Sequence, residues 1–255
     1  MKTKLHSLFV SILGLGLLSA SAQPGGPGGG MGGPNFGGSM SKLFGDNKNF
    51  SAVLEIQAKD GAAGDTTIPG KLAFDDGKSR FEMDMTKMKS SKMPAEAVAQ
   101  MKAMGMDSMV VISRPDKKTS YMIYPGLKAY AEMPLKEANS PEAIDKFKME
   151  KTELGKETVD GHACVKYKVV VTDDKEKKQE FTVWDAIDLK SFPVKLEMLE
   201  RGSTVTMNFK DVKLAKPEAT LFDAPSDLKR YDNMMALMQE EVMKKMGGGL
   251  TPPGR

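Results

Sequence analysis

The sequence is poor in the residues that build disulfides and metal sites. It has one cysteine, Cys164, and two histidines among 255 residues. A single cysteine cannot form a disulfide within the chain, so a hydrophobic core must hold the fold. The sequence also lacks a large excess of either charge, because it has 37 basic and 34 acidic residues. A nearly balanced chain has no electrostatic reason to bind nucleic acid, so we expect no such partner.

A membrane-spanning run is missing as well. The longest largely apolar stretch, residues 8–18, has 11 residues, whereas a membrane-spanning helix needs about 20. Lys2 and Lys4 precede it, and the small residues 20–22 follow it, which is the pattern of a cleaved signal peptide. We therefore expect residues 1–22 to be removed near Ala22 and the protein to be periplasmic or secreted. Cys164 is far from this position, so we expect no lipid anchor.

The mature chain divides by composition. Removal of residues 1–22 leaves 233 residues with a net charge of about +1. Residues 23–41 are rich in glycine and proline and predict a disordered tether, and residues 247–255 predict a second loose tail. Between them we expect a folded domain over residues 42–231 and a methionine-rich helix over residues 232–246.

Period-two alternation dominates the folded region. In residues 162–171, Val165, Tyr167, Val169 and Val171 share one side, while Cys164 and two lysines share the other. Such alternation predicts a strand with one buried face. Comparable runs separated by turn residues give about ten strands, so a single sheet would have to curl or close. The predicted fold class is mainly β (α+β), a curved antiparallel half-barrel with helices covering its concave face.

Three segments have helical character. Residues 94–104 are rich in helix formers, and residues 140–147 begin with a serine cap followed by proline. In the third, residues 232–246, Met235, Met238, Val242 and Met246 form a stripe at helical spacing. We expect the first and third helices to cover the sheet as lids.

Several motifs resemble a known family. The run Gly155–Tyr167, with its tight turn at Asp160-Gly161, is similar to an uncharacterised secreted bacterial group, domain of unknown function 4412. Residues 183–186 and 192–195 resemble the strands that follow in that group. Residues 217–225 look like the end of the wider lipoprotein-carrier superfamily of the LolA, LolB and LppX type. The resemblance implies a half-barrel with an apolar cavity between sheet and helices. Characterised relatives carry acyl chains, but no functional motif of theirs matches a position here.

The function predicted from these features is non-enzymatic binding of a lipid, an acyl chain or another hydrophobic ligand, as a carrier or sensor. An envelope membrane or a lipoprotein is a further candidate partner, and no cofactor is expected. An enzyme is disfavoured because no residue is placed to activate a nucleophile. The candidate ligand-binding residues are apolar or aromatic: Met83, Met85, Met101, Met104, Tyr121, Ile123, Val165, Tyr167, Val169, Trp184, Leu196, Met198, Met235 and Met238.

The 21 methionines leave one alternative open. Thioethers bind Cu(I), so a periplasmic copper-binding protein could use Met83 and Met85 together with His162 and Cys164. Methionine is also a flexible filler that adapts to irregular apolar surfaces. We favour this second role, because soft-metal sites rarely lack nearby histidine or cysteine ligands, and His162 and Cys164 would serve only if the methionines fold against them.

Overall fold

The computed structural model describes residues 38–59, 64–91, 94–135, 139–200 and 202–245. The predicted signal peptide, most of the predicted tether and the tail at 247–255 lie outside these residues. Within the described ranges, no helix is long and apolar enough to cross a membrane.

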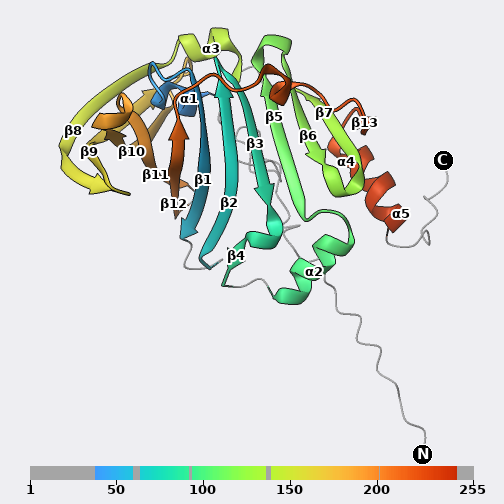
Figure 1. Ribbon diagram of the computed structural model, residues 1–255. Coiled ribbons are helices and arrows are strands. Elements are labelled where there is room, and N and C mark those ends of the chain that lie inside the picture. The colour runs from blue at the N-terminus through green and yellow to red at the C-terminus, as the bar shows by residue number, and fades with distance from the viewer. Residues whose placement is uncertain (1–37, 60–63, 92–93, 136–138, 201, 246–255) are drawn as a thin grey trace, which may run out of the picture. The chain divides into compact units, whose positions relative to one another are not determined.

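Within the described residues, thirteen strands form one sheet (Figure 1). They are β1 (Asn49–Lys59), β2 (Thr66–Asp75), β3 (Lys78–Asp84), β4 (Lys89–Ser90), β5 (Ser108–Arg114), β6 (Thr119–Tyr124), β7 (Ala129–Pro134), β8 (Lys148–Val159), β9 (His162–Thr172), β10 (Lys178–Ala186), β11 (Phe192–Glu200), β12 (Ser203–Lys213) and β13 (Lys229–Tyr231). The order across the sheet is β13-β7-β6-β5-β3-β2-β1-β12-β11-β10-β9-β8, and β4 pairs with β2.

The sheet is curved and open, with β8 and β13 at its two edges. All pairs are antiparallel except β13 with β7. Pairing of β1 with β12 joins the early and late hairpins into one sheet. The prediction of a mainly β fold with a curved sheet is confirmed. The predicted count of about ten strands is too low, because β4 and β13 have only 2 and 3 residues, too few to show an alternation.

One face of the sheet, here called the inner face, carries the main core. In β1 the alternate residues Phe50, Ala52, Leu54 and Ile56 are all buried there. A cluster of phenylalanines lies at its centre, with ring centroids 4.7 to 5.9 Å apart: Phe44, Phe50, Phe74, Phe192 and Phe209. Alternation along the strands thus converts directly into one continuous apolar face.

The opposite, outer face carries a smaller core over β5 to β7. Its buried members include Ile112, Tyr121, Ile123 and Phe222. Phe222 comes from the segment between β12 and β13, which crosses this face (Figure 1). Arg114 fixes the crossing, since its Nη1 donates to the carbonyl oxygen of Phe222 at 3.0 Å. The β5–β7 part of the sheet is therefore covered on both faces.

Helices cover the inner face at two places. α1 (Ser39–Leu43) inserts Met40 and Leu43 into the core. A C-terminal helix, residues 234–245, packs on β7 and β13 and buries Leu237. It consists of α4 (Met234–Leu237), a π-helical turn (Met238–Val242) and α5 (Met243–Lys245). Of the predicted third helix, residues 232–246, the structure has residues 234–245 helical. Residues 39–41, placed in the predicted tether, belong to α1, because Met40 has a core to enter.

The other two helices contribute no residue to the main core cluster, although α3 (Pro141–Asp145) contacts α1. α3 has the predicted cap, since the Ser140 side chain accepts from the backbone N–H of Ala143. α2 (Ala95–Ala103) confirms the first predicted helix, but it has no fully buried residue and contacts the 3-10 turn Met85–Lys87. The expectation that α2 covers the sheet is therefore not confirmed, since the helix buries none of its side chains fully.

A close backbone contact links the loop after α2 to the turn between β6 and β7. A Cβ on Gly105 would lie 2.6 Å from the carbonyl oxygen of Gly126, and Gly105 has a φ of +73°. Lys245 Nζ also donates to this Gly126 oxygen at 2.9 Å. Only glycine fits such a position without displacing backbone.

Replacement of this glycine tests the contact. We expect Gly105→Ala to lower the free energy of unfolding by about 2 kcal/mol, because strain at positive φ adds to the overlap with Gly126. Urea denaturation measures the change. Gly77→Ala is the matched control, since Gly77 has a φ of +86° but nothing within 4 Å of the added carbon. Equal losses for the two variants would show that the close contact costs nothing.

Candidate apolar binding site

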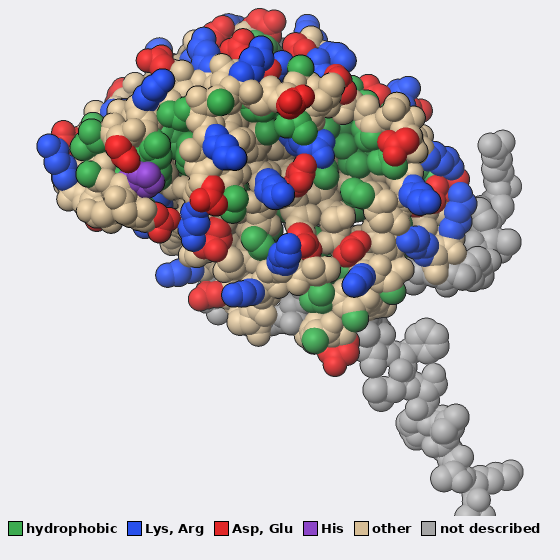
Figure 2. All heavy atoms as spheres, viewed as in Figure 1, with side chains coloured by type: hydrophobic (Ala, Val, Ile, Leu, Met, Phe, Trp, Pro, Cys, Tyr) green, Lys and Arg blue, Asp and Glu red, His purple; other side chains and the backbone are tan. Residues whose placement is uncertain are grey.

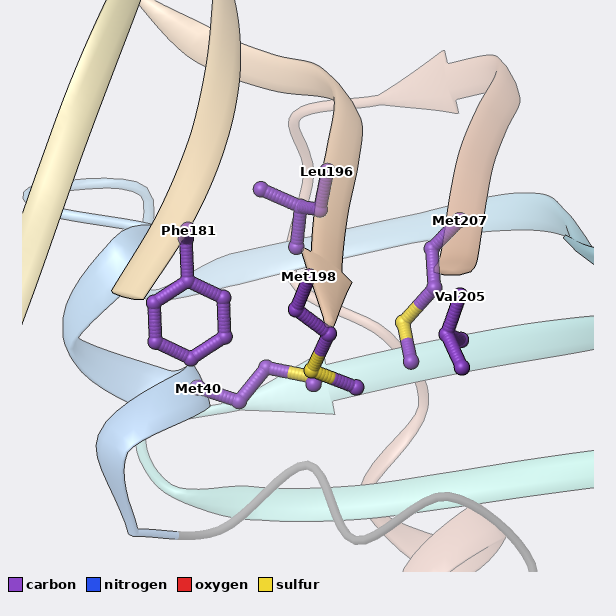
Figure 3. Close-up of a pocket in the computed structure, with 6 residues that line it drawn as sticks. All are labelled: Met40, Phe181, Leu196, Met198, Val205 and Met207. Atoms are coloured by element: carbon purple, nitrogen blue, oxygen red, sulfur yellow. The ribbon is translucent and has the colours of Figure 1, made fainter. Parts of the chain in front are cut away.

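The candidate site is a small pocket on the inner face (Figure 3). Its lining is entirely apolar and comes from four elements: Met40 of α1, Phe181 of β10, Leu196 and Met198 of β11, and Val205 and Met207 of β12. Figure 3 shows the side chain of Met40 extending from α1 toward that of Met198. The pocket is therefore floored by three neighbouring strands and closed on one side by α1.

Strand register explains why these side chains meet. Leu196 pairs with Val183 of β10 on one side and with Met207 of β12 on the other. Two residues further along, Met198 pairs with Val205. Directly paired residues point to the same face, and alternate residues along a strand share that face. The site follows from apolar residues at every second position of adjacent strands.

The pocket is smaller than the cavity expected from the sequence. Its side chains leave no room between them for even a water molecule, whereas pockets for small molecules usually measure roughly 300 to 1,000 Å³. The apolar cavity expected between sheet and helices is therefore not open at this place. Three of its six side chains are methionines, which are unbranched and have three rotatable bonds. A ligand with a long apolar chain therefore requires these side chains to move, and Met40 is the one that does not belong to the sheet.

Many of the predicted ligand-binding residues do lie on the inner face. Leu196 and Met198 line the pocket. Met83 and Val169 are buried in the same core, and Met85, Tyr167 and Met238 are partly buried against it. Val165 is half-buried and pairs with Asp185.

Other predicted residues lie elsewhere. Tyr121 and Ile123 belong to the outer-face core, because their neighbours Met122 and Tyr124 take the inner positions. Trp184 belongs to the main core cluster but does not line the pocket, and the ammonium groups of Lys166 and Lys195 lie 4.7 and 4.1 Å from its ring centroid. These three residues cannot line the pocket.

The predicted lid methionines are also placed differently. Met235 is 71% exposed, since the buried side of the C-terminal helix runs through Met234, Leu237 and Met238. The predicted stripe is therefore wrong at its first residue, because Met234 and not Met235 packs against the core. Met101 and Met104 are half-exposed on α2 and at its end, outside the core cluster.

Four pocket residues were not among the candidates. Phe181, Val205 and Met207 occupy alternate positions of strands that the sequence does predict, so alternation could have found them. Met40 had a weaker signal, because it follows the glycine-rich segment. Met40, Leu43 and Phe44 nevertheless have the i, i+3, i+4 spacing of a helix face.

His162 and Cys164 do not form a thiol–imidazole pair. His162 Nδ1 lies 2.7 Å from Asp188 Oδ2 at the surface, and Cys164 Sγ donates to the backbone oxygen of His162 at 3.4 Å. Burial raises the pKa of the Cys164 thiol, which disfavours the thiolate that a metal or a substrate would need. The sulfur is therefore a structural group.

The copper alternative gains no support. Met83 lies on β3, six strand positions from the β9 strand of His162 and Cys164. Among the described residues, no group of three or more histidine, cysteine, aspartate or glutamate side chains could hold a metal ion. The structure does not assemble the four proposed ligands.

One ion pair lies beside the apolar wall. Lys151 of β8 pairs with Val169, so its side chain is on the inner face, where Nζ lies 2.5 Å from Asp185 Oδ2 and 4.5 Å from the Tyr167 ring centroid. The Asp185 side chain is 4% exposed, and its Oδ1 accepts no hydrogen bond from the described residues. Burial raises the pKa of Asp185, and Lys151 opposes that rise.

Comparison with known families gives one match. Residues 68–191 match the family described as "Domain of unknown function (DUF4412)". The predicted resemblance to that family is thereby confirmed over these residues. A comparison with curated proteins found no match.

Several solved structures are distantly similar. A LolA superfamily protein from Nitrosomonas europaea has a TM-score of 0.38 at 8% identity, over 72% of this chain and 93% of that one. Lipoprotein LppX from Mycobacterium tuberculosis has a TM-score of 0.36 at 9% identity, over 68% and 92%. LprF from Mycobacterium bovis has a TM-score of 0.36 at 11% identity, over 71% and 98%.

Proposed function

We propose that this chain, which carries a DUF4412 match over residues 68–191, is a non-enzymatic binding protein for a lipid, an acyl chain or another hydrophobic ligand. One observation supports this above all: all six side chains that line the inner-face pocket are apolar. A site without a polar group selects a ligand by the apolar surface that it removes from water. Each Å² of such surface contributes about 25 cal/mol.

The side chains beside the pocket are compatible with a ligand larger than the pocket itself. Met40, Met198 and Met207 can adopt other rotamers at low cost, because methionine is unbranched. Met40 is attached to a helix of only five residues, so its displacement disturbs no strand pairing. Movement of Met40 would extend the pocket along the apolar inner face.

Catalysis is not part of the proposal. The buried Cys164 has a raised pKa, and the exposed His162 contacts Asp188 rather than a hydroxyl or a thiol that it could activate. Both observations leave the chain without an activated nucleophile at these two residues. We further propose that the protein works in the periplasm or outside the cell, where an envelope membrane or a lipoprotein could supply the ligand.

Substitution of Met40 tests the site. We expect Met40→Trp to weaken binding of N-phenyl-1-naphthylamine, an uncharged apolar fluorophore, at least about tenfold, because the bulkier indole cannot move aside for the ligand as readily as the methionine side chain. Fluorescence titration gives the dissociation constant. Met235→Trp makes the same exchange at a site that is 71% exposed and should leave binding unchanged.

A second variant guards against misfolding. Met40→Ala enlarges the pocket without adding bulk, so it should bind the fluorophore as tightly as the unmodified protein or more tightly. Circular dichroism and urea denaturation establish that each variant is folded. Unchanged affinity of a folded Met40→Trp variant, or no uptake by the unmodified protein, would refute a binding site at Met40.

A further inference from the structure

The C-terminal helix is attached to the sheet in an unusual way for a core element. Of its twelve residues, 234–245, only Leu237 is fully buried. The strand beneath it, β7, contributes the small residues Ala129 and Ala131, both with no exposed surface. The apolar part of the attachment therefore consists of Leu237 and its partly buried neighbours, which pack on a strand that offers two alanines.

Charged contacts supply the rest of the attachment. Lys229 of β13 pairs with Glu240, and its Nζ lies 3.5 Å from Glu241. The hydroxyl of Tyr231, also on β13, donates to Glu241. At the end of the helix, Lys245 donates to the carbonyl oxygen of Gly126 at 2.9 Å. Both glutamates belong to the π-helical turn, so this turn presents two adjacent carboxylates to β13.

The charged contacts differ in exposure, because the Glu241 side chain is only 16% exposed and its partner Tyr231 is buried. The side chains of Lys229 and Glu240 are 49% and 43% exposed. Exposed ion pairs are weak and are screened by salt, so each adds little to the attachment. A helix held by one buried side chain, four partly buried apolar ones and a few ion pairs can leave the sheet without unfolding it, since the strands beneath keep their own hydrogen bonds.

We propose that the C-terminal helix is a flap that opens as a unit, held closed by Leu237 and by the contacts of Glu240 and Glu241 with Lys229 and Tyr231. Opening uncovers Ala129 and Ala131 and the inner face beside them. The flap lies over β7, whereas the pocket lies on β10 to β12. The proposal therefore does not depend on the pocket or on its ligand.

Two lysine substitutions test whether the contacts of Glu240 and Glu241 with β13, here called the latch, hold the flap closed. Lys229 links β13 to both glutamates, whereas Lys244 pairs with the same two glutamates from within the helix. We expect Lys229→Gln to speed amide hydrogen exchange of residues 237–245 by roughly three- to fivefold, the size of an exposed ion pair or slightly more. Lys244→Gln, which removes the same charge without a link to β13, should change it less than about twofold. Exchange is measured on the full chain by mass spectrometry.

A change of salt and a change of the anchor complete the test. Raising sodium chloride to about 1 M should reproduce the effect of Lys229→Gln in the unmodified protein, because ions screen the latch. Leu237→Ala should speed exchange of residues 234–245 while β5 and β6 stay protected. Equal effects of the two lysine variants would overturn the latch, and loss of protection in β5 and β6 together with the helix would overturn the flap.

Discussion

Phe44→Ala is expected to lower the free energy of unfolding by about 4 kcal/mol, the loss typical of a fully buried phenylalanine. Phe44 follows α1 and is 1% exposed. Its ring centroid lies 4.7 Å from that of Phe50 and 5.3 Å from that of Phe74, and it contacts two further phenylalanines. These partners belong to separate strands, so no single strand can shift to fill the space that the ring leaves.

Urea denaturation measures this loss, and Phe147→Ala provides the comparison. Phe147 is only partly buried against the core, so its removal should cost about 1 kcal/mol. In Phe44→Ala we also expect faster proteolysis within residues 39–43, because α1 loses its main anchor. A loss near 1 kcal/mol for Phe44→Ala would mean that α1 contributes little to the core.

The second large effect concerns the ion pair of Lys151 and Asp185. Lys151→Met keeps the aliphatic stem and removes only the charge. We expect it to cost about 3 kcal/mol at pH 7, because a carboxylate that is 4% exposed loses its partner. Asp185→Asn should cost about 1 kcal/mol, since the Lys151 side chain is 36% exposed and can turn to water. Denaturation of the two variants compares the costs directly.

The cost of Lys151→Met should depend on pH. Burial raises the pKa of Asp185 in the folded protein. Below about pH 4 this carboxyl group is protonated in both the folded and the unfolded protein, so it destabilises the fold least there. Stability is lost as the pH rises through the folded pKa. Without Lys151 that pKa rises further, and the loss grows. The two proteins should therefore differ little near pH 3 and most near pH 7, and a pH-independent difference would exclude ionisation of Asp185 as the cause.

Much of the sheet could be predicted because alternation is local. In β9, Val169 and Val171 are buried and Tyr167 packs against the core, as their shared side predicts. The same pattern does not say which side is inner. Tyr121 and Ile123 alternate as cleanly as the inner residues, but the crossing segment with Phe222 covers them on the outer face. That assignment depends on a contact between residues about a hundred positions apart.

The cover of the pocket was harder to predict. Met40, Leu43 and Phe44 have helical spacing, but α1 has only five residues and follows a glycine-rich segment. Such a short helix is unstable alone and forms because its apolar side chains enter a core made by distant strands. The buried side of the C-terminal helix was also hard to predict from the sequence, because it depends on how the helix docks on β7.

The two edges of the sheet bear on how copies of this chain behave together. β13 offers only three residues to a neighbour, whereas β8 has twelve, nearly all exposed. In β8, lysine and glutamate recur along its length, and the backbone departs from regular pairing at Gly155, where φ is +140°. Basic and acidic side chains are interspersed over the visible face of the molecule (Figure 2). Mixed charges and an irregular edge discourage an adjoining strand from adding. A protein with so wide an open sheet can thus remain a separate particle, and neutral replacements along β8 would favour its growth into fibrils.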